Sequence, residues 1–348
     1  MINSFPNLTK FIGLYLATVV LTANGKQKGI IGSICNLLLL FMFYRFRSRT
    51  SDTAILLANL ALSDLGIVSF GNPFSSSSNL AGRWLYGDDG CQWYAFFGFF
   101  FGSAHIGTLT FLALDRYNKI CRITISNPRV ETSPYNIIAV ILSIWLYALF
   151  WALMPMIGWA SYGLEPLITS CTIDWRQNDD SYKSFIIVYA IFGYFLPFTI
   201  IFFSYRSVRR WINSRDPQVR WTNCLGDYWT NQKNITFMTI VINIAFLLAW
   251  TPYALLCLYV VFGDPADVPV WFSLLPPLMA KTSTIFNPLI YFLTNPRIRS
   301  AIWITLKCSD INQLDEEIEN NHTNRDNSGE TSTSCDKSRN ENLIPLNA

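Results

Sequence analysis

Long apolar stretches separated by short polar segments recur along this chain of 348 residues. A helix needs about 20 apolar residues to cross the hydrocarbon core of a bilayer. The stretches near or above that length are Gly29–Phe46, Thr53–Pro73, Cys91–Cys121, Asn136–Trp159, Phe185–Tyr205, Asn234–Phe262 and Trp271–Leu293. The pattern therefore predicts an all-α membrane protein, a bundle of seven transmembrane helices over residues 29–295.

A less regular segment precedes this predicted bundle. In residues 1–28, the apolar run Phe11–Leu21 is too short to span a membrane comfortably. We interpret it as the top of a broken first span. A signal peptide that ends near Ala23 is the alternative.

The C-terminal end is expected to hold a short surface helix and a tail. Residues 296–308 show an amphipathic pattern that is typical of a helix lying on the membrane surface. Its apolar face contains Ile298, Ala301, Ile302 and Leu306. Residues 309–348 are rich in Asn, Ser, Thr, Asp and Glu, which predicts a disordered cytosolic tail. Cys308 suits palmitoylation at the inner leaflet.

Composition and charge placement agree with an integral, multi-pass membrane protein. Hydrophobic residues make up 51% of the chain and charged residues 14%, with a mean hydropathy of +0.27, which excludes an ordinary soluble domain. Basic residues gather after the first, third and fifth stretches: Arg45, Arg47, Arg49, Lys119, Arg122, Arg129, Arg206, Arg209, Arg210, Arg215 and Arg220. By the positive-inside rule, the N-terminus is extracellular and the C-terminus is cytosolic. The glycosylation sequon at Asn7 then lies on the extracellular side.

Lys281 is the one lysine or arginine well inside a predicted span. A charge at that depth costs roughly 2.5–3.5 kcal/mol on insertion scales. Such a lysine is retained when it pairs with a carboxylate, or when its amine forms a chemical bond such as a Schiff base with a carbonyl. A structural lysine, paired with an acid or reaching to the interface, is the alternative.

The eight cysteines do not form a disulfide scaffold. Only Cys91 and Cys171 fall at the extracellular surface, where oxidation is permitted. Cys91 opens the third span and Cys171 lies in the loop after the fourth span. One disulfide between them would hold this loop over the bundle.

Several short motifs occur in a fixed order along the predicted spans. They are Asn59-Leu60-Ala61 with Asp64, Asp115-Arg116-Tyr117, Trp250-Thr251-Pro252 and Asn287-Pro288-Leu289-Ile290-Tyr291. Together with the cysteine pair, they resemble the rhodopsin-like class of G-protein-coupled receptors. Lys281, seven residues before Pro288, stands where opsins of that class attach retinal.

Four further segments look like peropsins, the opsins that are associated with retinal photoisomerisation in supporting cells. They are Gly158-Trp159-Ala160-Ser161-Tyr162, Cys171-Thr172-Ile173-Asp174-Trp175, Phe262-Gly263-Asp264-Pro265 and Ala280-Lys281-Thr282-Ser283-Thr284. The similarity extends from about Asn36 to Cys308. It implies all-trans or 11-cis retinal as the cofactor, a heterotrimeric G protein as a partner, and arrestin as a further candidate partner.

A protonated retinal Schiff base in an apolar bundle requires a nearby carboxylate. Vertebrate visual opsins place this acid three residues after the bridging cysteine, where this chain has Tyr94, which is not an anion at neutral pH. A second group of opsins carries the acid six residues before the other cysteine, where this chain has Glu165. The resemblance therefore implies Glu165 as the counterion of Lys281. An exposed loop glutamate is the alternative.

The resemblance also implies other residues of a retinal pocket. Trp250 and Tyr253 are expected to stack on the polyene, and Gly102 to leave room for it. Trp175 is expected to close the outer side of the pocket. Ordinary core packing is the alternative for these rings, since aromatic residues make up 16% of the chain.

Two polar residues inside the spans are expected to meet. Asp64 matches the mid-membrane acid of the class and should lie near Asn287. His105 stands where related receptors commonly have a small residue, so we expect it to contact Asp64 and to fill space otherwise used by water or sodium. A core histidine with no switching role is the alternative.

The resemblance further implies a G-protein switch at the end of the third span. Arg116 is expected to pair with Asp115 at rest and to face a G protein in the active state. The usual second acid at the base of the sixth span is replaced by Gln232. This replacement weakens one interaction of the inactive state.

Together these features predict a peropsin-like photoreceptor rather than an enzyme, with light-driven isomerisation of all-trans to 11-cis retinal and G-protein coupling. The alternatives are a conventional signalling opsin with 11-cis retinal in the dark, and a non-opsin ligand-gated receptor in which Lys281 is incidental. The two halves of the chain show no repeat, so a transporter finds no support. No catalytic residue, metal site or nucleic-acid partner is expected.

Overall fold

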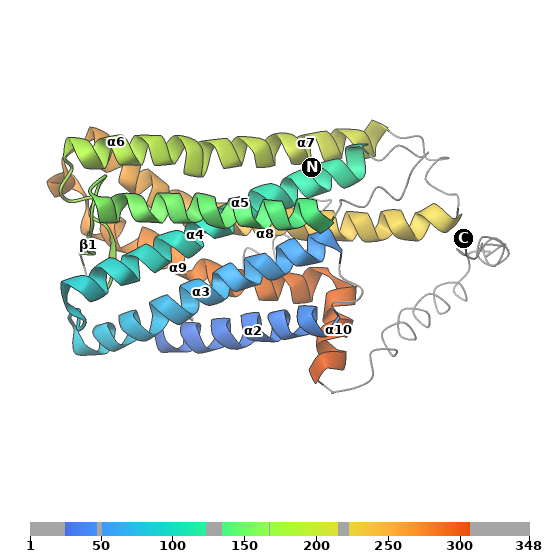
Figure 1. The fold of residues 1–348 in the computed structure, drawn as a ribbon, viewed down its shortest axis with the longest axis horizontal. Helices are drawn as coiled ribbons and strands as arrows, with labels where there is room; N and C mark the ends of the chain where they lie inside the picture. The colour runs from blue at the N-terminus through green and yellow to red at the C-terminus, as the bar shows by residue number, and fades with distance from the viewer. Residues whose placement is uncertain (1–24, 47–50, 123–133, 167, 215–222, 307–348) are drawn as a thin grey trace.

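The computed structural model describes residues 25–46, 51–122, 134–166, 168–214 and 223–306. In these ranges the chain forms a bundle of long helices that run side by side (Figure 1). The expectations for Asn7, Phe11–Leu21, Cys308 and the C-terminal tail concern residues outside the described ranges, and they stay predictions.

The helices follow the predicted spans. Their bounds are α2 Gly25–Arg45, α3 Asp52–Ala81, α4 Gly87–Tyr117 with the π-helix η3 Asn118–Arg122, α5 Pro134–Leu153 with the 3₁₀-helix η4 Met154–Ile157, α8 Asn223–Phe262, α9 Val270–Thr294 and α10 Pro296–Leu306. The fifth span consists of α6 Asp180–Tyr189, the π-helix η5 Ala190–Phe195 and α7 Leu196–Ser214. A 3₁₀-helix, η7 Pro265–Asp267, precedes α9.

The described residues contain five helices that are long and apolar enough to cross a membrane, and a shorter apolar helix at Gly32–Arg45 in α2. Helix α9 belongs to the same bundle because it packs against α2, α3 and α8. The predicted class, an all-α bundle of seven spans, therefore agrees with the arrangement of the helices. Helix α10 lies across one end of this bundle (Figure 1).

Helix α3 is longer than predicted. Ser51 caps its N-terminus by accepting a hydrogen bond from the Ala54 main-chain N–H at 3.4 Å. We expected the helix to end at Pro73, but it continues to Ala81 and ends at Gly82, whose φ of +66° suits glycine. The prediction was wrong because a proline removes only one main-chain donor. A proline inside a spanning helix is therefore tolerated.

Buried apolar side chains form two clusters along the bundle. The first joins α2, α3, α4, α5, α8 and α9 around Leu60, Leu109 and Ile242. The second is rich in aromatic rings, among them Tyr182 and Phe185, and it lies beside two short strands. A cavity borders both clusters.

The two strands form a lid over one end of the bundle, which we call the lid end. Strand β1 Tyr162–Leu164 pairs antiparallel with β2 Cys171–Ile173, in a register that places Leu164 opposite Cys171. The predicted disulfide between Cys91 and Cys171 is present and ties β2 to the start of α4. Burial raises the pKa of the Tyr162 phenol, which stays protonated and donates to the Ala152 carbonyl at 2.9 Å. The lid is thus attached to α4 and α5.

Helix α10 buries most of the apolar face that was predicted. Ala301 and Ile302 are buried as expected, and Ile304 is buried with them against α2 and α9. Leu306 is 54% exposed. The difference arises because α2 and α9 cover the helix from one side, whereas the sequence shows only its apolar periodicity.

Candidate functional site

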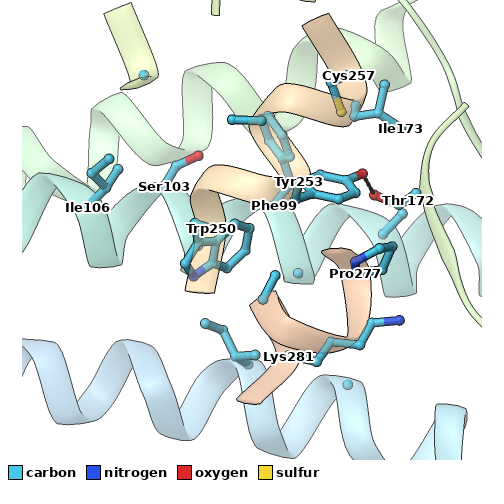
Figure 2. Close-up of a pocket in the computed structure, with 18 of the residues that line it drawn as sticks. Phe99, Ser103, Ile106, Thr172, Ile173, Trp250, Tyr253, Cys257, Pro277 and Lys281 are labelled. Carbon is cyan, nitrogen blue, oxygen red and sulfur yellow. Dashed lines mark hydrogen bonds between the residues drawn. The ribbon is translucent and has the colours of Figure 1, made fainter. Parts of the chain in front are cut away.

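The cavity lies inside the bundle, between α3, α4, the α6–η5 segment, α8, α9 and the lid (Figure 2). Most of the side chains that line it are apolar. They include Ile67, Val68, Ala95, Phe99, Ile106, Ile173, Ile186, Ala190, Phe246, Trp250, Ala254, Leu258, Pro277 and Ala280. Such a lining is typical of a site for an apolar small molecule whose orientation is determined by a few polar groups.

Lys281 supplies the polar group at one end of the cavity. Its Nζ atom lies 2.9 Å from Oε2 and 3.1 Å from Oε1 of Glu165. The Lys281 side chain is 38% exposed although it lies inside the bundle, because it borders the cavity instead of packing against neighbours. The amine is therefore paired and at the same time accessible to a molecule in the cavity.

The lid positions Glu165. Its main-chain N–H donates to the Ser170 carbonyl at 2.8 Å, which closes the turn between β1 and β2. Cys171 follows Ser170 directly, and its disulfide with Cys91 holds this part of the lid against α4. Glu165 is buried, and among the described residues that line the cavity it is the only carboxylate. The lid thus brings a single negative charge to the Lys281 amine.

Ser170 is a site residue that the sequence did not suggest. Its hydroxyl accepts a hydrogen bond from Lys281 Nζ at 2.9 Å and donates one to Oε2 of Glu165. The register of the β1–β2 hairpin brings it there, and that register is visible only in the structure. Tyr94, in α4, also lines this end of the cavity and interacts with the Lys281 amine.

The aromatic candidates on α8 line the middle of the cavity (Figure 2). Trp250 donates from Nε1 to the Ser283 hydroxyl at 3.2 Å, and Tyr253 shares a hydrogen bond with Thr172 of the lid at 2.6 Å. A β-carbon at Gly102 would lie 3.4 Å from the Trp250 ring. A side chain at Gly102 would therefore occupy the space beside Trp250.

Trp175 does not have the expected position. It is buried in the aromatic cluster of the lid end and is not among the described residues that line the cavity. The prediction failed because Trp175 lies just past β2, where its ring packs into the cluster. Thr172 and Ile173 of β2 border the cavity instead.

A polar cluster lies deeper in the bundle. Asp64 Oδ2 accepts from Asn287 Nδ2 at 2.7 Å, and Asp64 Oδ1 lies 3.0 Å from His105 Nδ1. The imidazole is not well aligned with the carboxylate, and neither His105 nitrogen makes a hydrogen bond to a described residue. The structure thus brings together the three residues that were expected to meet, with incomplete hydrogen bonding.

A stack of rings connects this cluster to the cavity. The His105 ring stacks on Phe246 at a centroid distance of 5.0 Å, and Phe246 stacks on Trp250 at 5.7 Å. Phe246 and Trp250 both line the cavity. The three rings therefore form a continuous path of contacts between the cavity and the polar cluster.

The end of the bundle opposite the lid contains the expected switch residues, and we call it the switch end. Arg116, fully buried, pairs with Asp115 and donates to the Thr53 hydroxyl. Its Nη1 atom also donates to Oε1 of Gln232 at 2.9 Å. Lys119 pairs with Asp115 at 2.9 Å. Arg116 is thus held to α8 by a neutral amide.

The remaining motif residues lie at the ends of α4 and α9. Tyr117 is the last residue of α4. Pro288 lies inside α9 between Asn287 and Tyr291. Tyr291 is fully buried, and its hydroxyl has no hydrogen-bond partner among the described residues. An uncommitted hydroxyl is able to take a new partner without breaking an existing bond.

Comparison with known proteins gives a consistent result. Residues 35–291 match the model of the "7 transmembrane receptor (rhodopsin family)". Human visual pigment-like receptor peropsin is 39% identical over 280 residues, which cover 80% of this chain and 82% of the relative. Mouse Opsin-5 is 35% identical over 76% of this chain and 70% of the relative. The crystal structure of squid rhodopsin superposes with a TM-score of 0.76 at 27% identity, covering 93% of both chains.

The contact between His105 and Asp64 leads to a prediction about sodium. In His105→Ser, the carboxylate loses its neighbour and gains space for a cation. Sodium at ten times its dissociation constant would then stabilise the fold by about 1.4 kcal/mol. We expect the melting temperature of this variant to rise when sodium chloride replaces potassium chloride, and the original chain to show no difference. In the matched control, Asp64→Asn with His105→Ser, the rise should vanish, and a rise that persists there would contradict the idea.

Proposed function

We propose that this chain, which belongs to the rhodopsin family of seven-transmembrane receptors, is an opsin that binds retinal through a protonated Schiff base on Lys281, with Glu165 as the counterion. The observation that supports this most directly is the ion pair of these two residues at the end of an apolar cavity. A free lysine inside a membrane would be expensive. A lysine that faces an apolar cavity has room for a bound aldehyde.

The residues of the cavity fit retinal. The cavity is lined by aliphatic and aromatic side chains, and it is polar at the Lys281 end. When bound, retinal supplies the absorption of light and the photoisomerisation. The Lys281 amine would form the Schiff base with the retinal aldehyde. The negative charge of Glu165 would keep the Schiff-base nitrogen protonated. Ser170 orients both groups by hydrogen bonding to each.

The direction of isomerisation forms the finer part of the proposal. We propose that the dark pocket accepts all-trans retinal and that light produces the 11-cis form, because the chain is 39% identical to a peropsin. The second candidate is a conventional signalling opsin, in which 11-cis retinal is bound in the dark. It is favoured by the switch residues at the switch end, where Arg116 pairs with Asp115 and donates to Gln232.

The proposal includes the orientation of the chain in the membrane and its protein partners. The chain is an integral membrane protein, and the basic loops support an extracellular N-terminus and a cytosolic C-terminus. The switch end then faces a heterotrimeric G protein, and arrestin is a further candidate partner there. A non-opsin receptor remains the alternative in which the pairing of Lys281 is purely structural.

The first test removes the amine. Lys281→Arg retains a cation that can pair with Glu165, so it should fold, whereas it cannot condense with an aldehyde. We expect Lys281→Ala and Lys281→Arg to reach the membrane and to form no visible pigment with retinal, measured by absorbance and acid denaturation. A covalently bound visible chromophore in the arginine variant would refute the assignment.

The second test removes the counterion. In Glu165→Gln the protonated nitrogen loses its negative neighbour, so it releases its proton at neutral pH. Absorbance should move from the visible to the ultraviolet. Ser170→Ala should show a smaller effect in the same direction, because Glu165 loses only one hydrogen bond. Tyr94→Phe keeps the carboxylate and should keep the visible absorbance, whereas an unchanged spectrum in Glu165→Gln would point to another acid.

The third test determines the direction of photoisomerisation and its effect on G-protein activation. Retinal isomers are extracted before and after illumination, and nucleotide exchange by a G protein is measured in parallel. We expect all-trans retinal in the dark, 11-cis retinal after light, and lower exchange in light than in the dark. The opposite conversion, with exchange that rises in light, would exclude the isomerase and leave the conventional signalling opsin.

A further inference from the structure

The cavity extends from Lys281 to the opposite side of the bundle. Helix α9 packs against α2, α3, α8 and α10, whereas η5 packs against α6, α7 and α8. Figure 2 shows Ser103 and Lys281 on opposite sides of Trp250. The residues Ser103, Tyr189, Gly193 and Tyr194 line the cavity on the α6–η5 side, and we call this part the hydroxyl end.

The hydroxyl groups at this end occur in pairs. The Ser103 and Tyr189 oxygens lie 3.0 Å apart, and the Tyr194 oxygen lies 2.6 Å from that of Thr251. Each hydroxyl carries one donor and two acceptor lone pairs. One hydrogen bond between two hydroxyls uses only one of their two donors. Each pair therefore keeps one O–H donor for which the described residues supply no acceptor.

Tyrosines behind the cavity wall are bonded differently. The Tyr147 hydroxyl donates to the Phe192 carbonyl at 3.1 Å, and the Tyr182 hydroxyl donates to the Cys257 carbonyl at 3.2 Å. Neither residue lines the cavity, and each uses its donor fully within the protein. Spare donors are thus a property of the cavity wall, where the Thr172–Tyr253 pair also leaves one, and not of the tyrosines behind it.

The backbone holds the Tyr189 ring in place. Gly193 lies one turn after Tyr189, and a β-carbon there would lie 2.6 Å from the Tyr189 ring. Any larger residue at position 193 would therefore displace the ring. The π-helix η5 begins directly after Tyr189, and such segments often occur at functional sites. Ser103 is fully buried. The pair is therefore a preformed feature that does not need a ligand to assemble it.

Unmodified retinal offers no hydrogen-bond acceptor to the spare O–H donors of the hydroxyl end. Its ring is a hydrocarbon and offers no acceptor, so a spare donor that the bound ring shields from water would remain without a partner. An oxygen on the ring would accept that donor. We propose that the hydroxyl end recognises a retinal whose ring carries a hydroxyl or keto oxygen. This inference rests on the proposed attachment of retinal at Lys281.

The test compares ring-modified retinals. All-trans retinal, 3-hydroxyretinal, 4-hydroxyretinal and 4-oxoretinal are titrated into the full chain, with binding measured by quenching of tryptophan fluorescence and by pigment absorbance. At least one oxygenated form should bind about two- to tenfold more tightly than retinal, which corresponds to one hydrogen bond. The keto form is informative because it only accepts hydrogen bonds.

A triple variant identifies the residues responsible. In Ser103→Ala with Tyr189→Phe and Tyr194→Phe, no residue that lines the hydroxyl end keeps an O–H donor, so the preference for oxygenated retinals should disappear and retinal should bind more tightly. Tyr147→Phe is the matched control, since it removes a hydroxyl outside the cavity wall and should retain the preference.

Two outcomes would overturn the inference: equal affinity of the original chain for all four compounds, or a preference that persists in the triple variant. The failure of the proposed function is a separate result. In that case none of the aldehydes would form a pigment with Lys281, while fluorescence quenching would still report any preference for a ring oxygen.

Discussion

The ion pair between Lys281 and Glu165 is the interaction on which the rest of the site depends. Glu165 is buried, and a buried carboxylate that loses its partner destabilises the fold. The pair joins residues 116 positions apart, so it exists only where a lid returns over the bundle. The β1–β2 hairpin and the disulfide between Cys91 and Cys171 provide that return.

The same ion pair explains how polar groups are distributed along the cavity. Because Lys281 borders open space and Glu165 approaches it from the lid, the charged groups gather at one end. The middle is left to Trp250 and Tyr253, whose polar atoms bond to Ser283 and to the lid. The opposite end carries hydroxyls with donors to spare. The cavity thus distinguishes its two ends chemically, which orients an elongated ligand.

A second consequence concerns the path from the cavity to the buried acid. Trp250, Phe246 and His105 form a continuous stack, and His105 ends beside Asp64. The stack is a spatial connection, and a coupling between its ends requires two discrete arrangements of these rings. The incomplete hydrogen bonding of His105 favours such rearrangement, because few bonds would have to break. At the switch end, the neutral Gln232 holds Arg116 more weakly than an acid would.

The sequence by itself determined the seven spans, the bridging cysteines and the importance of Lys281. These follow from local properties, namely the length of apolar runs, the sidedness of charge and the cost of a charge in lipid. It also proposed Glu165 through resemblance. Only the tertiary structure decided that Ser170 joins this pair, that Trp175 does not line the cavity, and that Tyr189 meets Ser103. The physical reason is that these contacts depend on hairpin register, on a π-helical turn and on the packing of distant helices, none of which leaves a periodic signal in the chain.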